Sequence, residues 1–94
     1  MMKYFCLPRR LGIARYPVAG ALYDVQLSAQ GLVVRRDGKP LFNATTPAEI
    51  RNVEFHRGAV RCEVRSGQAG QLRIGAGAAR PYAAGLARCE GRYE

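Results

Sequence analysis

The sequence predicts a mainly β protein of the α+β class, either a small antiparallel, partly open barrel or two packed sheets. About six to seven strands and one C-terminal α-helix are expected. Three observations predict this class: a self-registering hairpin at Arg57-Gly58, an Asp37-Gly38 turn between two apolar runs, and period-two alternation between positions 21 and 74.

The hairpin at Arg57-Gly58 specifies its own register. Folding the chain there gives apolar pairs on one side of the ribbon and an opposite-charge pair on the other, and a one-residue slip would turn the apolar set outward. The expected cross-strand pairs are Phe55 with Val60, Val53 with Cys62, and Glu54 with Arg61.

The N-terminal residues 1–20 are expected to form an irregular basic arm or an edge strand, placed near Tyr4–Leu7. Prolines and glycines break any longer period in this stretch. Residues 21–75 predict an antiparallel meander. Its expected strands are Ala21–Leu27, Leu32–Arg35, Pro40–Ala44, the two arms of the Arg57-Gly58 hairpin, and Leu72–Ile74.

Two segments predict helix. Thr46-Pro47-Ala48-Glu49 combines a capping residue, a proline at the first helical position and a glutamate three residues beyond the cap, which indicates a single turn. Residues 79–92 predict the closing helix. Its stripe of Tyr82, Leu86, Cys89 and Tyr93 falls at helical spacing and would cover the sheet.

The composition indicates one domain and suggests an anionic partner. The chain has 94 residues, 48% of them hydrophobic, and a formal net charge of +8. Most of the basic residues are arginine, which binds phosphate and carboxylate through paired hydrogen bonds. Compositional bias and general solvation explain the same arginines, and the spread of these residues along the chain favours that explanation over a dedicated anion site.

Two groups of basic residues are candidate anion sites. Arg35, Arg36 and Lys39 surround the first hairpin turn, where phosphorylated head groups are often bound. Alternative phosphate contacts are Arg9, Arg10 and Arg15 on the N-terminal arm, together with Arg80 at the predicted helix start. Nucleic-acid binding also needs aromatics between the basic residues, and the candidates are Tyr4, Tyr16 and Phe42.

The residues that catalysis requires are scarce, and we expect no enzyme. The sole histidine, His56, lies beside a hairpin turn, and the carboxylates have arginine neighbours. Cys6, Cys62 and Cys89 lack metal-ligand spacing, so no metal or cofactor is expected, and Cys62 and Cys89 are interpreted as small buried hydrophobes. Because no secretion signal or transmembrane-length segment is evident, we expect a cytoplasmic location.

The order of elements resembles the pleckstrin-homology-like superfold, in particular its bacterial and GRAM-type members. The resemblance rests on Leu32–Val34, Pro47–Val53, Val60–Val64, Leu72–Ile74 and the expected helix from Arg80 to Arg92. It implies a partly open barrel closed by a C-terminal helix. It also implies that Arg35, Arg36 and Lys39 correspond to the lipid-binding basic residues of the family's first hairpin loop.

A lesser resemblance is to PilZ-type cyclic-dinucleotide receptors. Gln26-Leu27-Ser28-Ala29-Gln30-Gly31 is similar to their D/N-x-S-x-x-G element and follows an arginine-rich arm, although Gln26 replaces the acid or amide.

Together these features predict a non-catalytic, PH-like binding or adaptor module. Its partner would be another protein, a second copy of the chain, or an anionic lipid head group. The alternative is a basic β-barrel that binds nucleic acid or a cyclic dinucleotide through the N-terminal arginines.

Overall fold

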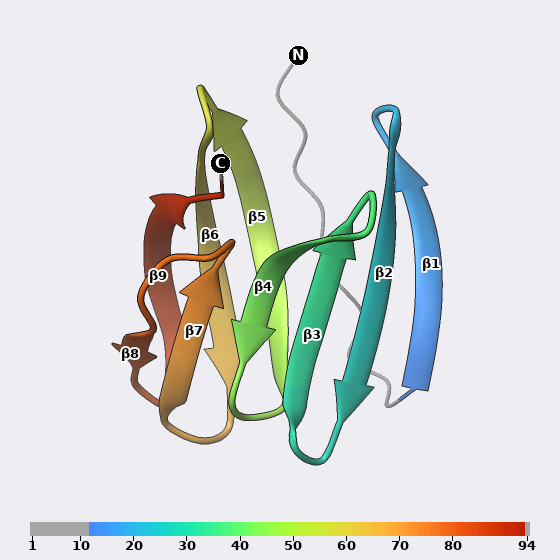
Figure 1. The fold of residues 1–94 in the computed structure, drawn as a ribbon. Coiled ribbons are helices and arrows are strands. Elements are labelled where there is room, and N and C mark those ends of the chain that lie inside the picture. The colour runs from blue at the N-terminus through green and yellow to red at the C-terminus, as the bar shows by residue number, and fades with distance from the viewer. Residues whose placement is uncertain (1–11, 94) are drawn as a thin grey trace.

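A computed structural model describes residues 12–93, which form nine β-strands and no helix, arranged as two antiparallel sheets (Figure 1). Sheet A has six strands in the order β1-β2-β3-β4-β7-β8, and sheet B has three in the order β5-β6-β9. The strand bounds are β1 Gly12–Val18, β2 Ala21–Ser28, β3 Gly31–Arg36, β4 Lys39–Ala44, β5 Ala48–His56, β6 Ala59–Ser66, β7 Gly70–Ile74, β8 Arg80–Tyr82 and β9 Gly85–Arg92.

Three hairpins turn on two residues that both have positive φ, the geometry that follows the natural twist of antiparallel strands. Asp37-Gly38 and Arg57-Gly58 turn as the sequence predicts, with φ of 51° and 82° at the first and 50° and 79° at the second. The third turn, Ala19-Gly20, joins β1 to β2 and was not predicted, because alanine rarely adopts positive φ.

The predicted register of the Arg57-Gly58 hairpin is confirmed near the turn, where Phe55 pairs with Val60 and Glu54 with Arg61. Further along, β5 carries a bulge between Arg51 and Glu54. Asn52 and Val53 therefore share the single opposing position of Cys62, with Asn52 at a φ of 52°. The bulge turns Asn52 outward and keeps Val53 on the buried side.

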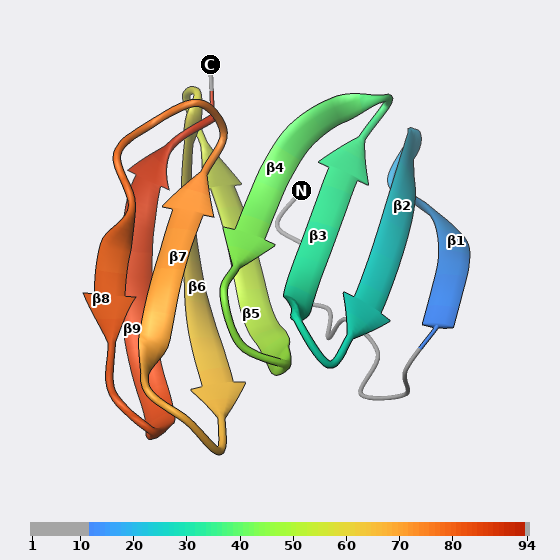
Figure 2. The same cartoon turned by 60° about the horizontal axis from the view of Figure 1, so that its bottom comes forward.

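The prediction of one continuous meander from residue 21 to 75 is wrong in its connections. β4 pairs with β7, while the intervening β5 and β6 belong to the second sheet. Figure 2 shows the chain leaving sheet A after β4, passing through sheet B, and returning as β7 beside β4. Of the two predicted architectures, two sheets is the one observed.

The core lies between the two sheets. Alternating residues of β2, β3, β4 and β7 in sheet A meet those of β5 and β6 in sheet B, as the period-two pattern predicts. The largest side chains with almost no exposure are Phe42, Leu32, Leu41, Ile50 and Leu72. The core also contains a buried network of hydroxyl groups, in which the Thr46 hydroxyl is hydrogen-bonded to that of Tyr82 at 2.6 Å and to that of Ser66 at 2.8 Å.

Both helix predictions are wrong. Residues 80–82 and 85–92 are strands, and β9 extends the second sheet by pairing with β6 along its whole length. Residues 48 and 49 begin strand β5, and the Thr46 hydroxyl bonds to Ser66 and Tyr82 instead of capping a helix. Within residues 1–20, Gly12–Val18 is an edge strand paired with β2. The edge strand expected near Tyr4–Leu7 lies outside the described residues.

Candidate binding surface

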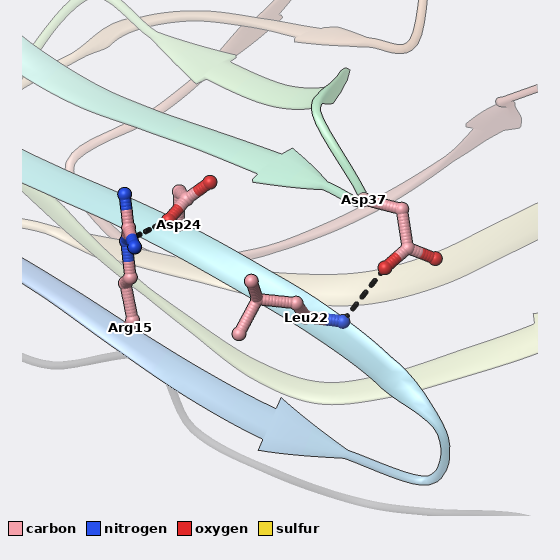
Figure 3. A network of polar contacts seen from close by, with 4 residues as sticks. All are labelled: Arg15, Leu22, Asp24 and Asp37. Atoms are coloured by element: carbon pink, nitrogen blue, oxygen red, sulfur yellow. Dashed lines mark hydrogen bonds and ion pairs between the residues drawn. The ribbon is translucent and has the colours of Figure 1, made fainter.

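The outer face of sheet A carries two arginines on either side of one aspartate. Arg15, Asp24 and Arg35 are direct cross-strand neighbours on β1, β2 and β3. Arg15 forms an ion pair with Asp24, with 2.9 Å between Nε and Oδ1 (Figure 3). The row thus holds two guanidinium groups and one carboxylate, and it has excess positive charge at the solvent-exposed surface.

A second row on the same face carries aliphatic side chains and, at its far end on β7, a third arginine. The next row of the register runs from Ile13 through Gln26, Val33 and Asn43 to Arg73. Ile13 is 77% exposed, which is high for a large hydrophobic residue. We call the set Ile13, Arg15, Asp24, Val33, Arg35 and Arg73 the sheet A face. A shallow hollow between the two rows is lined by its first five members together with Val25 and Gln26.

Asp37 fixes the end of this face. Its backbone N–H donates to the carbonyl of Leu22, and its Oδ1 accepts a bond of 2.8 Å from the Leu22 N–H (Figure 3). These bonds join the β3–β4 turn to the start of β2. Asp37 therefore holds the two hairpins together through these hydrogen bonds.

The structure separates the three residues predicted at the first hairpin turn. Arg35 points outward, while Arg36 lies over the rings of Phe55 and Tyr93, at 5.1 and 5.8 Å from their centroids. The Arg36 Nε also donates to the Tyr23 hydroxyl over 3.2 Å. Lys39 pairs with Arg36 across the hairpin and is exposed. Consecutive strand residues point to opposite faces, so Arg35 and Arg36 do not form one site.

The alternative phosphate contacts are also dispersed. Arg15 belongs to the sheet A face, and Arg80 lies on β8 at the opposite end of the same sheet. Arg9 and Arg10 lie outside the described residues. Of the aromatic candidates, Phe42 is fully buried and Tyr16 packs partly buried against the core. Tyr4 also falls outside the described part of the chain.

The outer face of sheet B balances its own charges. Arg61 lies between Glu54 and Glu90, and Glu63 lies between Arg51 and Arg88, as direct cross-strand neighbours. Arg61 is 3.4 Å from Glu90, and Asn52 donates to Glu63 over 2.7 Å. Four of the protein's seven acidic residues, Glu49, Glu54, Glu63 and Glu90, lie on this sheet. Sheet A therefore carries most of the unbalanced positive charge of the two sheets.

Two of the three cysteines meet across the β6–β9 pair. Cys62 is buried and Cys89 is half-buried, and both are free thiols. Burial raises the pKa of the Cys62 thiol to about 12. Burial also raises the pKa of Cys89, while the nearby Arg80 acts in the opposite direction. The prediction that Cys62 is a small buried hydrophobe agrees with its position on the core side of β6.

This burial predicts a loss of stability in alkali. The folded-state pKa of Cys62 exceeds its ordinary value, so its contribution is complete below about pH 9 and is lost progressively up to about pH 12. Tyr23, whose pKa burial also raises, acts in the same direction. We expect the free energy of unfolding to fall by a few kcal/mol over this window, and to fall less steeply in Cys62→Ala. Urea unfolding at several pH values measures this, and an equally steep fall in the variant would contradict it.

Among residues 12–93 the structure holds no candidate metal site. His56 is exposed at the hairpin end, as predicted. In this part of the chain no three His, Cys, Asp or Glu side chains gather closely enough to hold a metal ion. The described residues also include no helix that could span a membrane.

Comparison with protein-family models, curated proteins and solved structures gives no match to this chain. The PH-like and PilZ-like resemblances therefore remain predictions. The first has lost both of its helical elements, because Ala48–His56, Arg80–Tyr82 and Gly85–Arg92 are strands.

Proposed function

We propose that this protein is a non-catalytic binding module, and that the sheet A face binds an acidic segment of a partner protein. The observation that carries the proposal is the placement of Arg15 and Arg35 on either side of a single aspartate, with Arg73 on the same face. On the outer face of sheet B, by contrast, basic and acidic side chains lie directly opposite each other on neighbouring strands.

The mixture of side chains on the sheet A face favours a protein partner. Exposed Ile13 and half-buried Val33 lie beside the arginines, and arginine with aliphatic neighbours suits contact with another protein. Single-stranded nucleic acid needs aromatic rings for its bases to stack on. The tyrosines and phenylalanines of residues 12–93 all belong to the core or pack against it, so this face offers no such rings.

This proposal revises the sites expected from the sequence. Arg35 and Arg15 are retained, although they came from the two separate candidate groups. Arg36 is left out because it packs over two aromatic rings. An anionic head group or a nucleic acid remains an alternative ligand for the same arginines, and the experiment distinguishes them.

The test compares two variants that carry the same net charge. Arg35→Glu with Arg73→Glu reverses two charges on the sheet A face. Arg57→Glu with Arg92→Glu reverses two exposed charges away from sheet A, one in the β5–β6 turn and one on β9. We expect the first variant to bind labelled polyglutamate about tenfold or more weakly at low salt, and the control to stay within about threefold of the unmodified protein. Fluorescence anisotropy gives the affinities, and thermal unfolding checks that both variants fold.

Equal losses in the two variants would show that net charge alone governs binding, and would reject the sheet A face. Absence of polyglutamate binding at low salt would reject the proposal altogether. Single-stranded DNA and phosphatidylserine vesicles are measured in parallel. Tighter DNA binding with a steep salt dependence would favour the nucleic-acid alternative, and tighter vesicle binding would favour the head group.

A further inference from the structure

Cys62 and Cys89 occupy directly opposed positions in the β6–β9 pair. The register between the two strands is continuous, with no bulge from Ala59 to Ser66. Beyond its end, the Tyr93 N–H donates to the Gly58 carbonyl, which marks that pair as hydrogen-bonded. Hydrogen-bonded pairs recur at every second position, so Cys62 and Cys89 form such a pair, with Cα atoms about 5.5 Å apart. This separation lies within the range of disulfide bonds.

The two thiols lie on the same side of sheet B, because directly opposed residues of an antiparallel pair share a face. Cys62 is only 4% exposed, while Cys89 is half-buried. A hollow of about 220 Å³ between β8 and β9 has Cys89, Arg80 and Arg92 in its lining. Glu90 also lines this hollow, so its charged lining is two arginines and one glutamate. Cys89, as the more exposed of the two thiols and the one beside the hollow, is the expected point of entry for a reagent.

We propose that Cys62 and Cys89 form a reversible cross-strand disulfide when the protein meets a low-molecular-weight disulfide such as glutathione disulfide. The proposal goes beyond the binding function and does not rest on it. It also replaces the sequence-based view of these cysteines as inert hydrophobes.

The reaction proceeds by two thiol–disulfide exchanges. The Cys89 thiolate attacks one sulfur of glutathione disulfide, forms a mixed disulfide and releases one glutathione thiolate. The Cys62 thiolate then attacks the Cys89 sulfur, forms the Cys62–Cys89 bond and releases the second glutathione. Two protein thiols are oxidised and one glutathione disulfide is reduced to two thiols. The two protons lost from the cysteines go to the released glutathione thiolates.

Two features make the bond reversible and its formation slow at neutral pH. At a hydrogen-bonded pair the Cβ atoms stand farther apart than a relaxed disulfide requires, and strained disulfides are more easily reduced. Both thiols also have a raised pKa through burial, so little thiolate exists near pH 7. The rate of oxidation should therefore rise by about tenfold for each pH unit between 7 and 9.

The test uses the full chain with Cys6→Ser, which leaves only the proposed pair. Arg61 precedes Cys62 and Arg88 precedes Cys89, so trypsin releases residues 62–65 and 89–92 as separate peptides. After treatment of the folded protein with glutathione disulfide, we expect mass spectrometry to find these peptides joined within monomeric chains. Thiol titration should fall from two groups per chain to none, and dithiothreitol should restore both.

Single-cysteine variants test the order of the steps. In the Cys6→Ser background, Cys62→Ser should stop at one glutathione attached to Cys89, and Cys89→Ser should leave the buried Cys62 thiol essentially unmodified. Three results would overturn the proposal: glutathione that stays on Cys89 with Cys62 present, oxidation that requires urea, or linkage found only between chains. If Cys62 in Cys89→Ser reacts with glutathione disulfide as fast as Cys89 does in Cys62→Ser, Cys89 is not the first thiol to react and this step of the proposal is overturned.

Discussion

Gly31→Ala is expected to lower the free energy of unfolding by about 4 kcal/mol or more. A loss of this size would leave a large fraction of the molecules of a marginally stable domain unfolded. Gly31 opens β3 with a φ of 139°, where an L side chain is strained. An added Cβ would also lie 2.1 Å from the carbonyl oxygen of Ala44. The obstacle is backbone, so β3 and β4 would have to separate beside the pair of Leu32 with Ala44.

Gly20→Ala supplies the matched control. Gly20 also has positive φ, at 84°, but nothing lies within 4 Å of an added Cβ. Its expected cost is only the conformational penalty of about 1–2 kcal/mol. Urea unfolding followed by circular dichroism gives both values. Similar losses in the two variants would mean that the contact with Ala44 relaxes easily and that strain at positive φ explains both.

The parts of the fold predicted correctly are those in which local signals agree with each other. At Asp37-Gly38 and Arg57-Gly58, the turn residues and the flanking alternation favour the same hairpin, and both hairpins form. The connection of β4 to β7 could not be read in this way. The chain passes through the second sheet between β4 and β7, and no local sequence pattern indicates that these two strands pair.

The C-terminal segment shows why a periodic pattern can mislead. Tyr82, Leu86, Cys89 and Tyr93 have helical spacing, but in the structure Leu86 points outward and is 57% exposed. The inward residues of β9 are Ala87, Cys89 and Gly91, whose small size hid the period-two alternation. The packing leaves little room for a side chain at position 91, since an added Cβ would come within 3.2 Å of the Ile74 side chain.

The candidate site was partly predictable for a similar reason. The excess of arginine pointed to an anionic partner, but adjacency in sequence grouped Arg35 with Arg36, which the pleat of β3 separates. The relevant grouping, Arg15 with Arg35, spans two strand pairings. Its register follows from the Ala19-Gly20 and Ser28–Gly31 turns, and the first of these carries an alanine that gives no turn signal.

Arg36→Ala is expected to lower the free energy of unfolding by about 2–3 kcal/mol. The substitution removes the guanidinium from the rings of Phe55 and Tyr93 and the hydrogen bond to Tyr23, and each kind of contact contributes about 0.5–2 kcal/mol. Arg35→Ala, one residue away on the outer face, should change stability by less than about 0.5 kcal/mol. Arg36→Lys keeps the charge but lacks the planar group, so we expect it to restore only part of the loss.

Binding measurements should give the opposite order: Arg35 should matter for binding and Arg36 should not. At a temperature where all variants are folded, Arg35→Ala should weaken polyglutamate binding, while Arg36→Ala should leave it within about twofold, since Arg36 lies off the sheet A face. A stable Arg36→Ala protein that binds weakly would reverse this assignment. In that case Arg36 would be available to ligands in solution, and the hairpin-turn site of Arg35, Arg36 and Lys39 predicted from the sequence would replace the sheet A face.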